Sequence, residues 1–303
     1  MNIGGTSRAA PKVSIVTPSF NQGAYLEGTI VSVLAQSYPN IEYVVMDGGS
    51  TDDSEAILTR YSGRLAYWQS RPDGGFAEAL SQGFARTSGE ILAYLNSDDQ
   101  LAPHAVREAV RFLEERPDVV MVYGNRLCID AAGKLLYARP GSPFGARSRY
   151  SYILFGQESC FWRRTAFEQV GGVDTNLTFA VDYDLFSRLG RVGRVAHCGA
   201  IWGLFRRHRE SKTMTSFATV GRCEVAQVQR KLWGRTAPRW RVAATQFAFR
   251  LYILGYGTLR EFPPIESGVD LPRAGWADRI RGAFHNDSWL VRFVGRARRS
   301  GGR

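Results

Sequence analysis

The sequence lacks the cysteine patterns of a disulfide scaffold or a zinc site. Its 303 residues hold only four cysteines, which are widely spaced and form no Cys-x-x-Cys pair. Small disulfide-rich domains carry cysteines at high density, and structural zinc sites usually bring theirs in close pairs. The simplest interpretation is reduced thiols in a cytosolic setting.

The sequence also lacks a hydrophobic run long enough to cross a membrane. The longest apolar stretch, residues 247–256, is interrupted by Arg250, whereas a membrane-spanning helix needs roughly 20 apolar residues. Residues 1–12 are small and polar and lack the apolar core of a secretory signal. We therefore expect no spanning segment, no export and a cytoplasmic location.

Acidic residues are scarce at the C-terminal end. The formal net charge is +11, and residues 235–303 hold 13 arginines against five acidic residues, a net of +8. Such a basic region suits nucleic acid or an anionic membrane. No zinc-finger, RNP or basic-zipper motif accompanies it, so we expect no nucleic-acid partner and keep nucleic-acid binding only as a minor alternative.

Two interpretations of residues 235–303 stay open. In the first, helices pack on the body and the arginines are solvated. In the second, the segment attaches to anionic lipid, because apolar residues interleave with arginines. The apolar members of that pattern are Trp240, Phe247, Phe249, Leu251, Tyr252 and Leu254, and the arginines are Arg239, Arg241 and Arg250.

Strand-like and helix-like segments alternate over residues 12–123, a pattern typical of a parallel sheet covered by helices. The predicted strands are 12–17, 41–46, 65–69, 90–95 and 119–123, with helices between them. Residues 124–234 are less regular and predict a hairpin within 127–137, a strand at 159–163 and a helix at 181–189. The sequence therefore predicts an α/β domain over residues 1–234, in halves 12–123 and 124–234, followed by a helical, arginine-rich extension over 235–303.

Polar or acidic residues follow several of the predicted strands. They are Ser19, Asp47, Asp73, Asp98 and Asp99. In an open α/β sheet the ligand crevice lies at the carboxyl ends of the strands, so these groups are expected to converge. Adjacent carboxylates such as Asp98 and Asp99 persist at the end of a buried strand when they are exposed, hydrogen-bonded or bridged by a cation.

Five segments, in this order along the chain, resemble family 2 glycosyltransferases of the GT-A fold. They are SIVTPSFN at 14–21, EYVVMDGGSTDD at 42–53, RPDGG at 71–75 with LSQG at 80–83, GEILAYLNSDD at 89–99, and VDYDL at 181–185 with RRHRESKT at 206–213. The resemblance covers residues 12–215. It implies a Rossmann-like, mostly parallel central sheet flanked by helices, and an inverting enzyme that moves a sugar from a nucleotide diphosphate to an acceptor hydroxyl.

The resemblance implies a metal site at Asp98 and Asp99. A divalent ion, Mg²⁺ or Mn²⁺, prefers carboxylate oxygens and neutralises the charge of a diphosphate leaving group. Asp98 stands at the last position of the family's Asp-x-Asp motif. Asn96 stands at the first position, where it keeps an oxygen acceptor and loses a charge.

The resemblance also implies the donor contacts. Asp47 would accept a hydrogen bond from the nucleotide base, in a pocket lined by Pro18 and Ser19. Asp73 would contact the donor near the ribose or phosphate. Two further candidates for the diphosphate, from basic groups that the family places there, are Arg206 and His208.

The resemblance assigns the general base to Asp182. Inverting transfer needs one base to take the proton of the acceptor hydroxyl as it attacks. Val181 replaces a glutamate that is frequent in the family at the preceding position. Asp184 lies two positions further on and would face away from Asp182 on a helix, so we expect it at the surface or in a cap.

The expected partners follow from the same resemblance. The donor is a nucleotide-diphosphate sugar, most commonly a UDP-sugar, and the acceptor is a saccharide or a lipid-linked molecule. The expected role is cell-envelope or exopolysaccharide biosynthesis in the cytoplasm, at the inner face of the cell membrane. Asn96 and Val181 keep a second alternative open, an inactive scaffold that binds sugar nucleotide.

Overall fold

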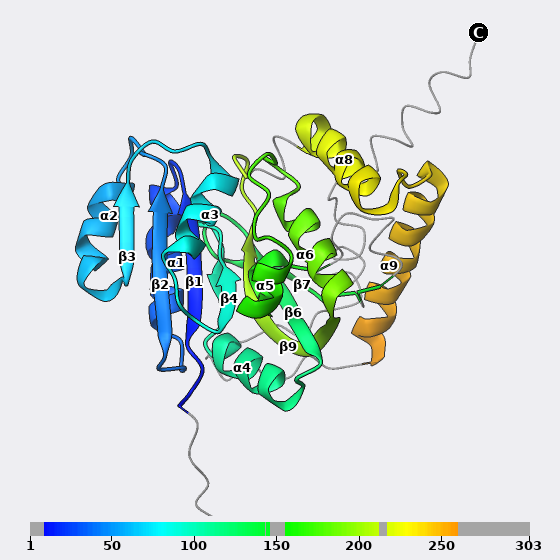
Figure 1. Ribbon diagram of the computed structural model, residues 1–303, viewed down its shortest axis with the longest axis horizontal. Helices are drawn as coiled ribbons and strands as arrows, with labels where there is room; N and C mark the ends of the chain where they lie inside the picture. The colour runs from blue at the N-terminus through cyan, green and yellow to red at the C-terminus, as the bar shows by residue number, and fades with distance from the viewer. Residues whose placement is uncertain (1–8, 143, 146–154, 212–216, 260–303) are drawn as a thin grey trace, which may run out of the picture.

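The computed structural model describes residues 9–142, 144–145, 155–211 and 217–259 (Figure 1). The predicted extension over 235–303 therefore falls partly outside the described residues, which end at Leu259.

The first half of the sheet is parallel, as the sequence predicts. Its strands are β1 (Val13–Ser19), β2 (Ile41–Asp47), β3 (Tyr67–Ser70) and β4 (Ile91–Tyr94), in the spatial order β3-β2-β1-β4. Each neighbouring pair runs parallel, and Ser19 at the end of β1 lies level with Asp47 at the end of β2. The carboxyl ends of these strands therefore share one edge, where the polar residues follow.

The second half of the sheet is mixed. From β4 the order continues through β8 (Cys160–Arg163), β6 (Val119–Ile129), β9 (Arg194–Arg206) and β5 (Gln100–Leu101), and β7 (Leu135–Arg139) pairs with β6. Among the described strands of this half, β6 and β9 pair parallel, whereas β8, β5 and β7 pair antiparallel to their neighbours. The predicted hairpin is confirmed as β6–β7. The 13-residue strand β9 was not predicted.

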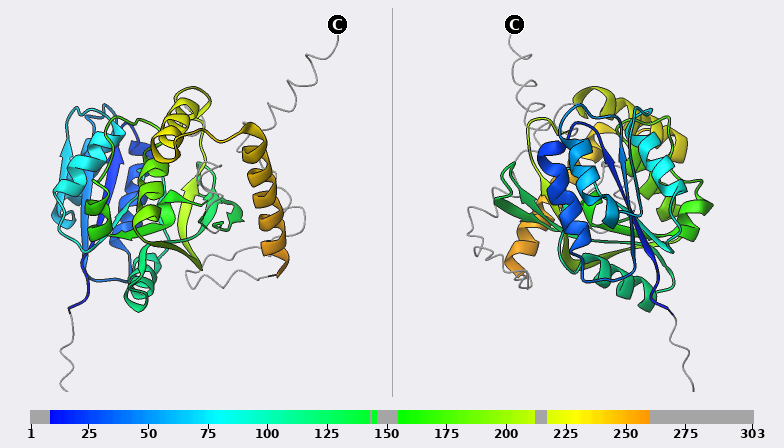
Figure 2. Two further views of the ribbon diagram at one scale, coloured as in Figure 1. Left: turned by 45° about the vertical axis from the view of Figure 1, so that its right-hand side comes forward. Right: turned by 90° about the vertical axis from the view of Figure 1, so that its left-hand side faces the viewer.

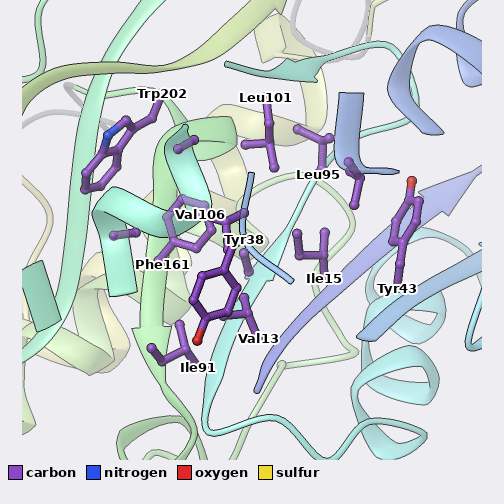
Figure 3. Packing of buried hydrophobic residues seen from close by; sticks show 14 of the residues in the cluster. Val13, Ile15, Tyr38, Tyr43, Ile91, Leu95, Leu101, Val106, Phe161 and Trp202 are labelled. Carbon is purple, nitrogen blue, oxygen red and sulfur yellow. The ribbon is translucent and has the colours of Figure 1, made fainter. Parts of the chain in front are cut away.

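Three helices cover one face of the sheet: α1 (Gly23–Leu34), α2 (Ser54–Tyr61) and α4 (Ala105–Glu115). Val13 and Ile15 alternate toward this face, since successive side chains of a strand point to opposite sides. Figure 3 shows both packed near Val106 of α4 and Phe161 of β8. Trp202 of β9 belongs to the same cluster.

The other face of the sheet is covered by α3 (Phe76–Ala85), α5 (Arg164–Gln169), α6 (Val181–Val192) and α8 (Arg222–Trp233). Val16 of β1 and Met46 of β2 point to this side. Helices on both faces of one sheet are the doubly covered α/β architecture that the strand–helix alternation predicts. Short turns complete it at η1 (Ser62–Arg64), η3 (Gln157–Ser159) and η4 (Phe217–Gly221).

The long helix α9 (Arg239–Leu259) lies at the periphery, at the opposite end of the molecule from β3 (Figures 1 and 2). Its Phe249 and Ile253 are buried. Within the described ranges, no helix has the length and hydropathy to cross a bilayer.

Candidate active site

Asp47 is held rigidly at the end of β2. Its side chain is fully buried, and its carboxylate accepts three hydrogen bonds from two serines. Ser50 donates its backbone N–H (2.9 Å) and its hydroxyl (2.6 Å), and Ser70 at the end of β3 donates its hydroxyl (2.7 Å). A carboxylate offers about four acceptor positions, so Asp47 keeps capacity for one more donor.

The β2 loop passes very close to the loop after β3. A Cβ atom at Gly49 would lie 2.8 Å from the backbone nitrogen of Pro72, and Gly49 has a φ of +81°. Both features require glycine, because a side chain would clash and a positive φ is strained for other residues. The resulting close approach brings Asp73 to the loop that carries Asp47.

Ser19 and Phe20 complete this end of the site. Ser19 is buried, and its hydroxyl has no hydrogen-bond partner among the described residues. Phe20 is 60% exposed, and both Phe20 and Asp73 lie within 3.5 Å of the position that a Cβ of Gly48 would take. Phe20 is a site residue that the sequence did not single out.

Asp73 stands beside these groups in the loop before α3. Its Oδ1 accepts the N–H of Gly75 at 2.7 Å. Partial burial raises the pKa of Asp73, and the negative charges of Glu78 and Asp47 add to that rise. The structure thus brings together Ser19, Asp47 and Asp73, three of the residues that the sequence predicts for donor binding, and Pro18 lies in the adjoining part of β1.

Asp98 pairs with His208 after the end of β4. His208 Nε2 lies 2.9 Å from Asp98 Oδ2, and the two side chains are 4% and 18% exposed. The Nδ1 atom of His208 has no partner among the described residues. The sequence predicts both residues for the donor site, and the structure places them in contact although 110 positions separate them.

Asp99 faces the interior. Its side chain is fully buried, and Oδ1 accepts the backbone N–H of Arg206 at 2.9 Å while Oδ2 accepts the Asn96 amide at 3.3 Å. Burial raises the pKa of Asp99 well above its ordinary value, and the negative charges of Asp98 and Glu158 raise it further. Asp99 therefore anchors the strand β9, whereas Asp98 reaches the edge of the site.

Arg206 also has a structural role. The residue is buried, and its guanidinium donates to three backbone carbonyls: Asp98 (3.0 Å), Asp130 (3.2 Å) and Ala131 (3.1 Å). It also lies 5.1 Å from the centroid of the Tyr25 ring, which contacts the His208 ring. This arrangement fixes the loop of Asp98, and the predicted contact between Arg206 and phosphate stays a prediction.

Glu158 is a buried carboxylate that the sequence did not single out. Its side chain is 2% exposed, lies 3.6 Å from Arg126 and leaves Oε1 without a donor among the described residues. Burial raises its pKa, although the positive charge of Arg126 lowers it. Sequence offers little signal for such a residue, since glutamate is seldom buried.

Asp182 is the second residue of α6, and its Oδ1 accepts the N–H of Tyr183 at 2.7 Å. Burial raises the pKa of the Cys160 thiol, and the negative charges of Glu158 and Asp182 raise it further. Glu158 in turn raises the pKa of Asp99. The role of Asp182 beside the Asp98–Asp99 turn stays a prediction.

The prediction for Asp184 is wrong. Asp184 is fully buried and forms an ion pair with Arg188 one helical turn later, at 2.5 Å. Its burial is tolerated because two cations lie beside it: Arg188 of α6 and Lys231 of α8, whose Nζ is 3.7 Å from Asp184 Oδ1.

Asp98 and His208 offer a carboxylate oxygen and an imidazole nitrogen, both of metal-ligand type. The 2.9 Å between Asp98 Oδ2 and His208 Nε2 is a hydrogen-bond distance, so an ion bound by both atoms would displace the proton that they share. Asp99 and Asn96 lie behind them. In the described part of the chain no group of three or more His, Cys, Asp and Glu side chains is clustered for a metal, so any ion here would take further ligands from substrate or water.

Known proteins match the chain as follows. The family described as Glycosyl transferase family 2 matches residues 14–171. An uncharacterized glycosyltransferase of Mycobacterium tuberculosis strain H37Rv is 36% identical over 191 residues, which cover 61% of this chain and 71% of that protein. The chondroitin synthase of Pasteurella multocida is 26% identical over 193 residues, 63% of this chain and 20% of that protein.

Two solved structures have the same fold. TarS of S. aureus, residues 1–349 in complex with UDP-GlcNAc, has a TM-score of 0.58 at 17% identity, covering 90% of this chain and 81% of that one. The mannosyltransferase PcManGT of Pyrobaculum calidifontis, in complex with GDP-Man and Mn²⁺, has a TM-score of 0.58 at 20% identity, covering 84% and 77%. The likeness confirms the α/β fold predicted for the chain, with its central sheet flanked by helices.

Proposed function

The chain belongs to glycosyl transferase family 2, and on that premise we propose that it moves a sugar from a nucleotide-diphosphate sugar to an acceptor hydroxyl with inversion. The observation that carries the proposal is the contact between Asp98 and His208 at the carboxyl end of β4. The pair lies after β4, whose carboxyl end is on the same sheet edge as those of β1 and β2, and α/β sheets bind ligands at this edge.

The nucleotide would bind over the ends of β1 and β2. Ser19 offers a buried hydroxyl without a partner, Asp47 offers a fixed carboxylate, and Phe20 offers an exposed ring. A base can stack on such a ring while the carboxylate accepts its N–H group. Asp73 lies close enough to Phe20 and Gly48 to contact the ribose or the phosphates.

Asp98 and His208 would hold a divalent ion, Mg²⁺ or Mn²⁺, against the diphosphate. When bound, such an ion neutralises the negative charge of the departing diphosphate. The binding of GDP-Man and Mn²⁺ by PcManGT supports this assignment. The predicted direct contact between Asp99 and metal is not carried into the proposal, because the Asp99 carboxylate is buried against Arg206 and Asn96. Asp99 instead fixes the turn that presents Asp98.

Asp182 would act as the general base. Its carboxylate would take the proton of the acceptor hydroxyl while that oxygen forms a bond to the anomeric carbon. The bond from the anomeric carbon to the diphosphate oxygen breaks on the opposite side, and its electron pair leaves with the nucleotide diphosphate. This single displacement inverts the anomeric configuration and uses one base.

We propose UDP as the nucleotide to test first, since TarS binds both UDP and UDP-GlcNAc. The acceptor would be a saccharide or a lipid-linked molecule, and the role would lie in cell-envelope or exopolysaccharide synthesis at the inner face of the cell membrane. Residues 12–123 would bind the nucleotide sugar and residues 124–234 the acceptor. The Pasteurella chondroitin synthase, a relative that makes a polysaccharide, supports this part of the proposal.

The test is calorimetric titration of the purified chain with UDP, GDP and dTDP and with their sugar conjugates, each in Mn²⁺ and in chelator. We expect one nucleotide to bind with a dissociation constant between about 1 µM and 1 mM, and to lose most of its affinity in chelator. Absence of binding to all three by folded protein would contradict the proposal. Binding without transfer to any acceptor in a screen would favour the inactive scaffold.

A further inference from the structure

The helix α9 has one buried face. Thr245, Phe249 and Ile253 are buried and recur every four residues, so they form one inward stripe. The guanidinium of Arg139 on β7 lies 5.4 Å from the centroid of the Phe249 ring. The packing of this face fixes which side of α9 points outward.

The outward face of α9 is apolar. Trp240, Phe247 and Leu251 are 66%, 61% and 53% exposed, and they account for three of the seven large hydrophobic residues exposed in the described ranges. Their spacing places them within about 40° of one another around a helix of 3.6 residues per turn. Ala243 and Ala244, both exposed, continue the stripe between them.

Arginines border this stripe. On a helical wheel Arg239 and Arg250 lie about 80–100° to one side and Arg241 lies about 100° to the other. The Arg241 guanidinium is 5.1 Å from the centroid of the Trp240 ring. Residues 235–259 contain no aspartate or glutamate. The outward surface of α9 is thus a line of large apolar groups between two lines of positive charge.

We propose that this surface of α9, formed by Trp240, Phe247 and Leu251 with the flanking arginines, docks on a bilayer that contains anionic lipid. A helix of this kind lies in the interface with its apolar side chains among the acyl chains and its arginines at the phosphates. Burying the stripe also removes an exposed apolar patch from water. No helix of the described residues can span a bilayer, so the contact would be peripheral.

The charges favour lipid over a second copy of the chain. Two copies packed stripe to stripe would bring the positively charged Arg239, Arg241 and Arg250 of both copies together, and residues 235–259 add no acidic residue to that contact. An anionic lipid surface complements this positive charge. The docking itself does not depend on the proposed function. Its biological purpose rests on that function, because an enzyme held at the bilayer would meet lipid-linked acceptors.

Vesicle sedimentation with the full chain tests this docking. We expect retention on vesicles of phosphatidylcholine mixed with phosphatidylglycerol at low salt, release as salt rises, and little retention on phosphatidylcholine alone. For the variant Trp240→Ser/Phe247→Ser/Leu251→Ser, the partition coefficient onto the mixed vesicles should fall roughly tenfold or more. The matched control Val31→Ser/Leu136→Ser removes two exposed apolar side chains elsewhere and should bind like the natural chain.

Three outcomes would overturn the docking proposal. They are no retention on the mixed vesicles, equal retention of the triple variant, and a dimer in light scattering that the triple variant converts to monomer. The donor titration is run on the same proteins. Unchanged donor binding by the triple variant separates a failure of docking from a failure of the proposed transferase activity.

A second inference comes from Glu224 of α8. This buried carboxylate accepts four hydrogen bonds from the residues that lead into α6. The donors are the N–H and hydroxyl of Thr178 (2.9 and 2.7 Å), the N–H of Phe179 (2.8 Å) and the N–H of Ala180 (2.9 Å). Burial opposes ionisation, yet these bonds outweigh it and hold the pKa of Glu224 below its ordinary value.

Glu224 holds the backbone that leads into α6. Ala180 is the N-cap residue of α6, and its methyl side chain cannot accept a helix N–H. Glu224 binds the N–H groups of residues 178–180, just ahead of the helix, where the positive end of the helix dipole favours negative charge. Asp182 comes two residues after Ala180. We infer that Glu224 is a positioning residue that fixes the backbone carrying Asp182, an inference that rests on the proposed role of Asp182.

Glu224→Gln tests this positioning role. The amide keeps one acceptor oxygen and turns an N–H group toward backbone N–H donors, so we expect kcat to fall roughly tenfold to a hundredfold with the donor KM nearly unchanged. The stoichiometry of donor binding by calorimetry corrects the rate for active protein. In the Asp182→Asn background the same change should lower the residual rate little, because residues that act as a unit are not additive.

Gln229→Ala is the matched control. It removes the 3.2 Å hydrogen bond from Gln229 on α8 to the Tyr183 hydroxyl and the 2.8 Å bond that Gln229 accepts from the Ala237 N–H, and it leaves the four bonds of Glu224 in place. We expect it to lower stability and to keep kcat. An unchanged kcat in Glu224→Gln, or an equal loss of kcat in both variants at full donor stoichiometry, would overturn the positioning role. Loss of donor binding in Glu224→Gln would overturn it as well.

Discussion

Asp182→Asn is expected to lower the rate of transfer by roughly 10²- to 10⁴-fold, the range typical for loss of a general base. The amide is nearly isosteric and accepts the Tyr183 N–H through its oxygen, so α6 should begin as before. It cannot take a proton from the acceptor hydroxyl. The measurements are kcat with a working acceptor and the dissociation constant of the donor, which should change less than about twofold.

Asp184→Asn is the matched control for that experiment. It makes the same chemical change two residues along α6, at a carboxylate that pairs with Arg188 inside the protein. Breaking a buried pair leaves an uncompensated charge, so we expect the free energy of unfolding to fall by about 3–5 kcal/mol while kcat per folded molecule stays close to normal. Full activity of Asp182→Asn would remove Asp182 from the base role.

Asp98→Ala is expected to abolish the part of donor binding that depends on metal. Asp98 supplies the only carboxylate of the proposed metal pair, and losing a ligand or its close support costs about 10- to 100-fold in metal affinity. In Mn²⁺ the affinity for the donor should fall by at least that factor. In chelator, Asp98→Ala and the natural chain should bind the donor equally weakly. Calorimetry under both conditions gives the two comparisons.

Asp99→Asn separates the two neighbouring carboxylates. Its amide would turn a donor toward the N–H of Arg206 or the amide of Asn96, so we expect a loss of about 1–3 kcal/mol in the free energy of unfolding, measured in urea. Metal-dependent donor binding by the folded fraction should persist. Equal loss of that binding in both variants would show that Asp99 holds the metal directly.

The parallel half of the fold could be predicted from sequence because its signals are local. Each strand from β1 to β4 is a short apolar run, each is followed by a helical stripe, and the polar residues stand where the runs end. Such a pattern depends only on neighbours in the chain, and it implies one shared edge for Ser19, Asp47 and Asp98.

The strand β9 could not be predicted because its pattern is broken. Gly199 and Gly203 interrupt the alternation of its side chains, and Gly203 is required by the close packing of Glu158, whose Cγ would lie 2.5 Å from a Cβ there. Glycine within a run reads as a turn or a bulge when the neighbouring strand is unknown. Residues 194–206 form a strand because they pair with β6, which lies far from them in the sequence.

The roles inside the site were only partly predictable. Asp98 and Asp99 are adjacent acids with the same local signals, yet one reaches the edge and the other anchors Arg206. Phe20 cannot be told from a core aromatic by its sequence neighbours. The contact of Arg206 with phosphate stays a prediction, and the three carbonyls that its guanidinium binds could not be foreseen from sequence. Each difference depends on which distant segment packs alongside.

The bond between the Arg206 N–H and Asp99 spans 107 residues, and it constrains the order in which this chain folds during synthesis. Domains form as the chain emerges from its N-terminal end, and contacts between distant residues close late. Until β9 has been made, Asp99 after β4 lacks one of its two donors, and Asp98 lacks His208. The parallel half of the sheet is thus encoded early in the chain but gains its last contacts late, and a fragment that ends before Arg206 should lack the bond that holds Asp99.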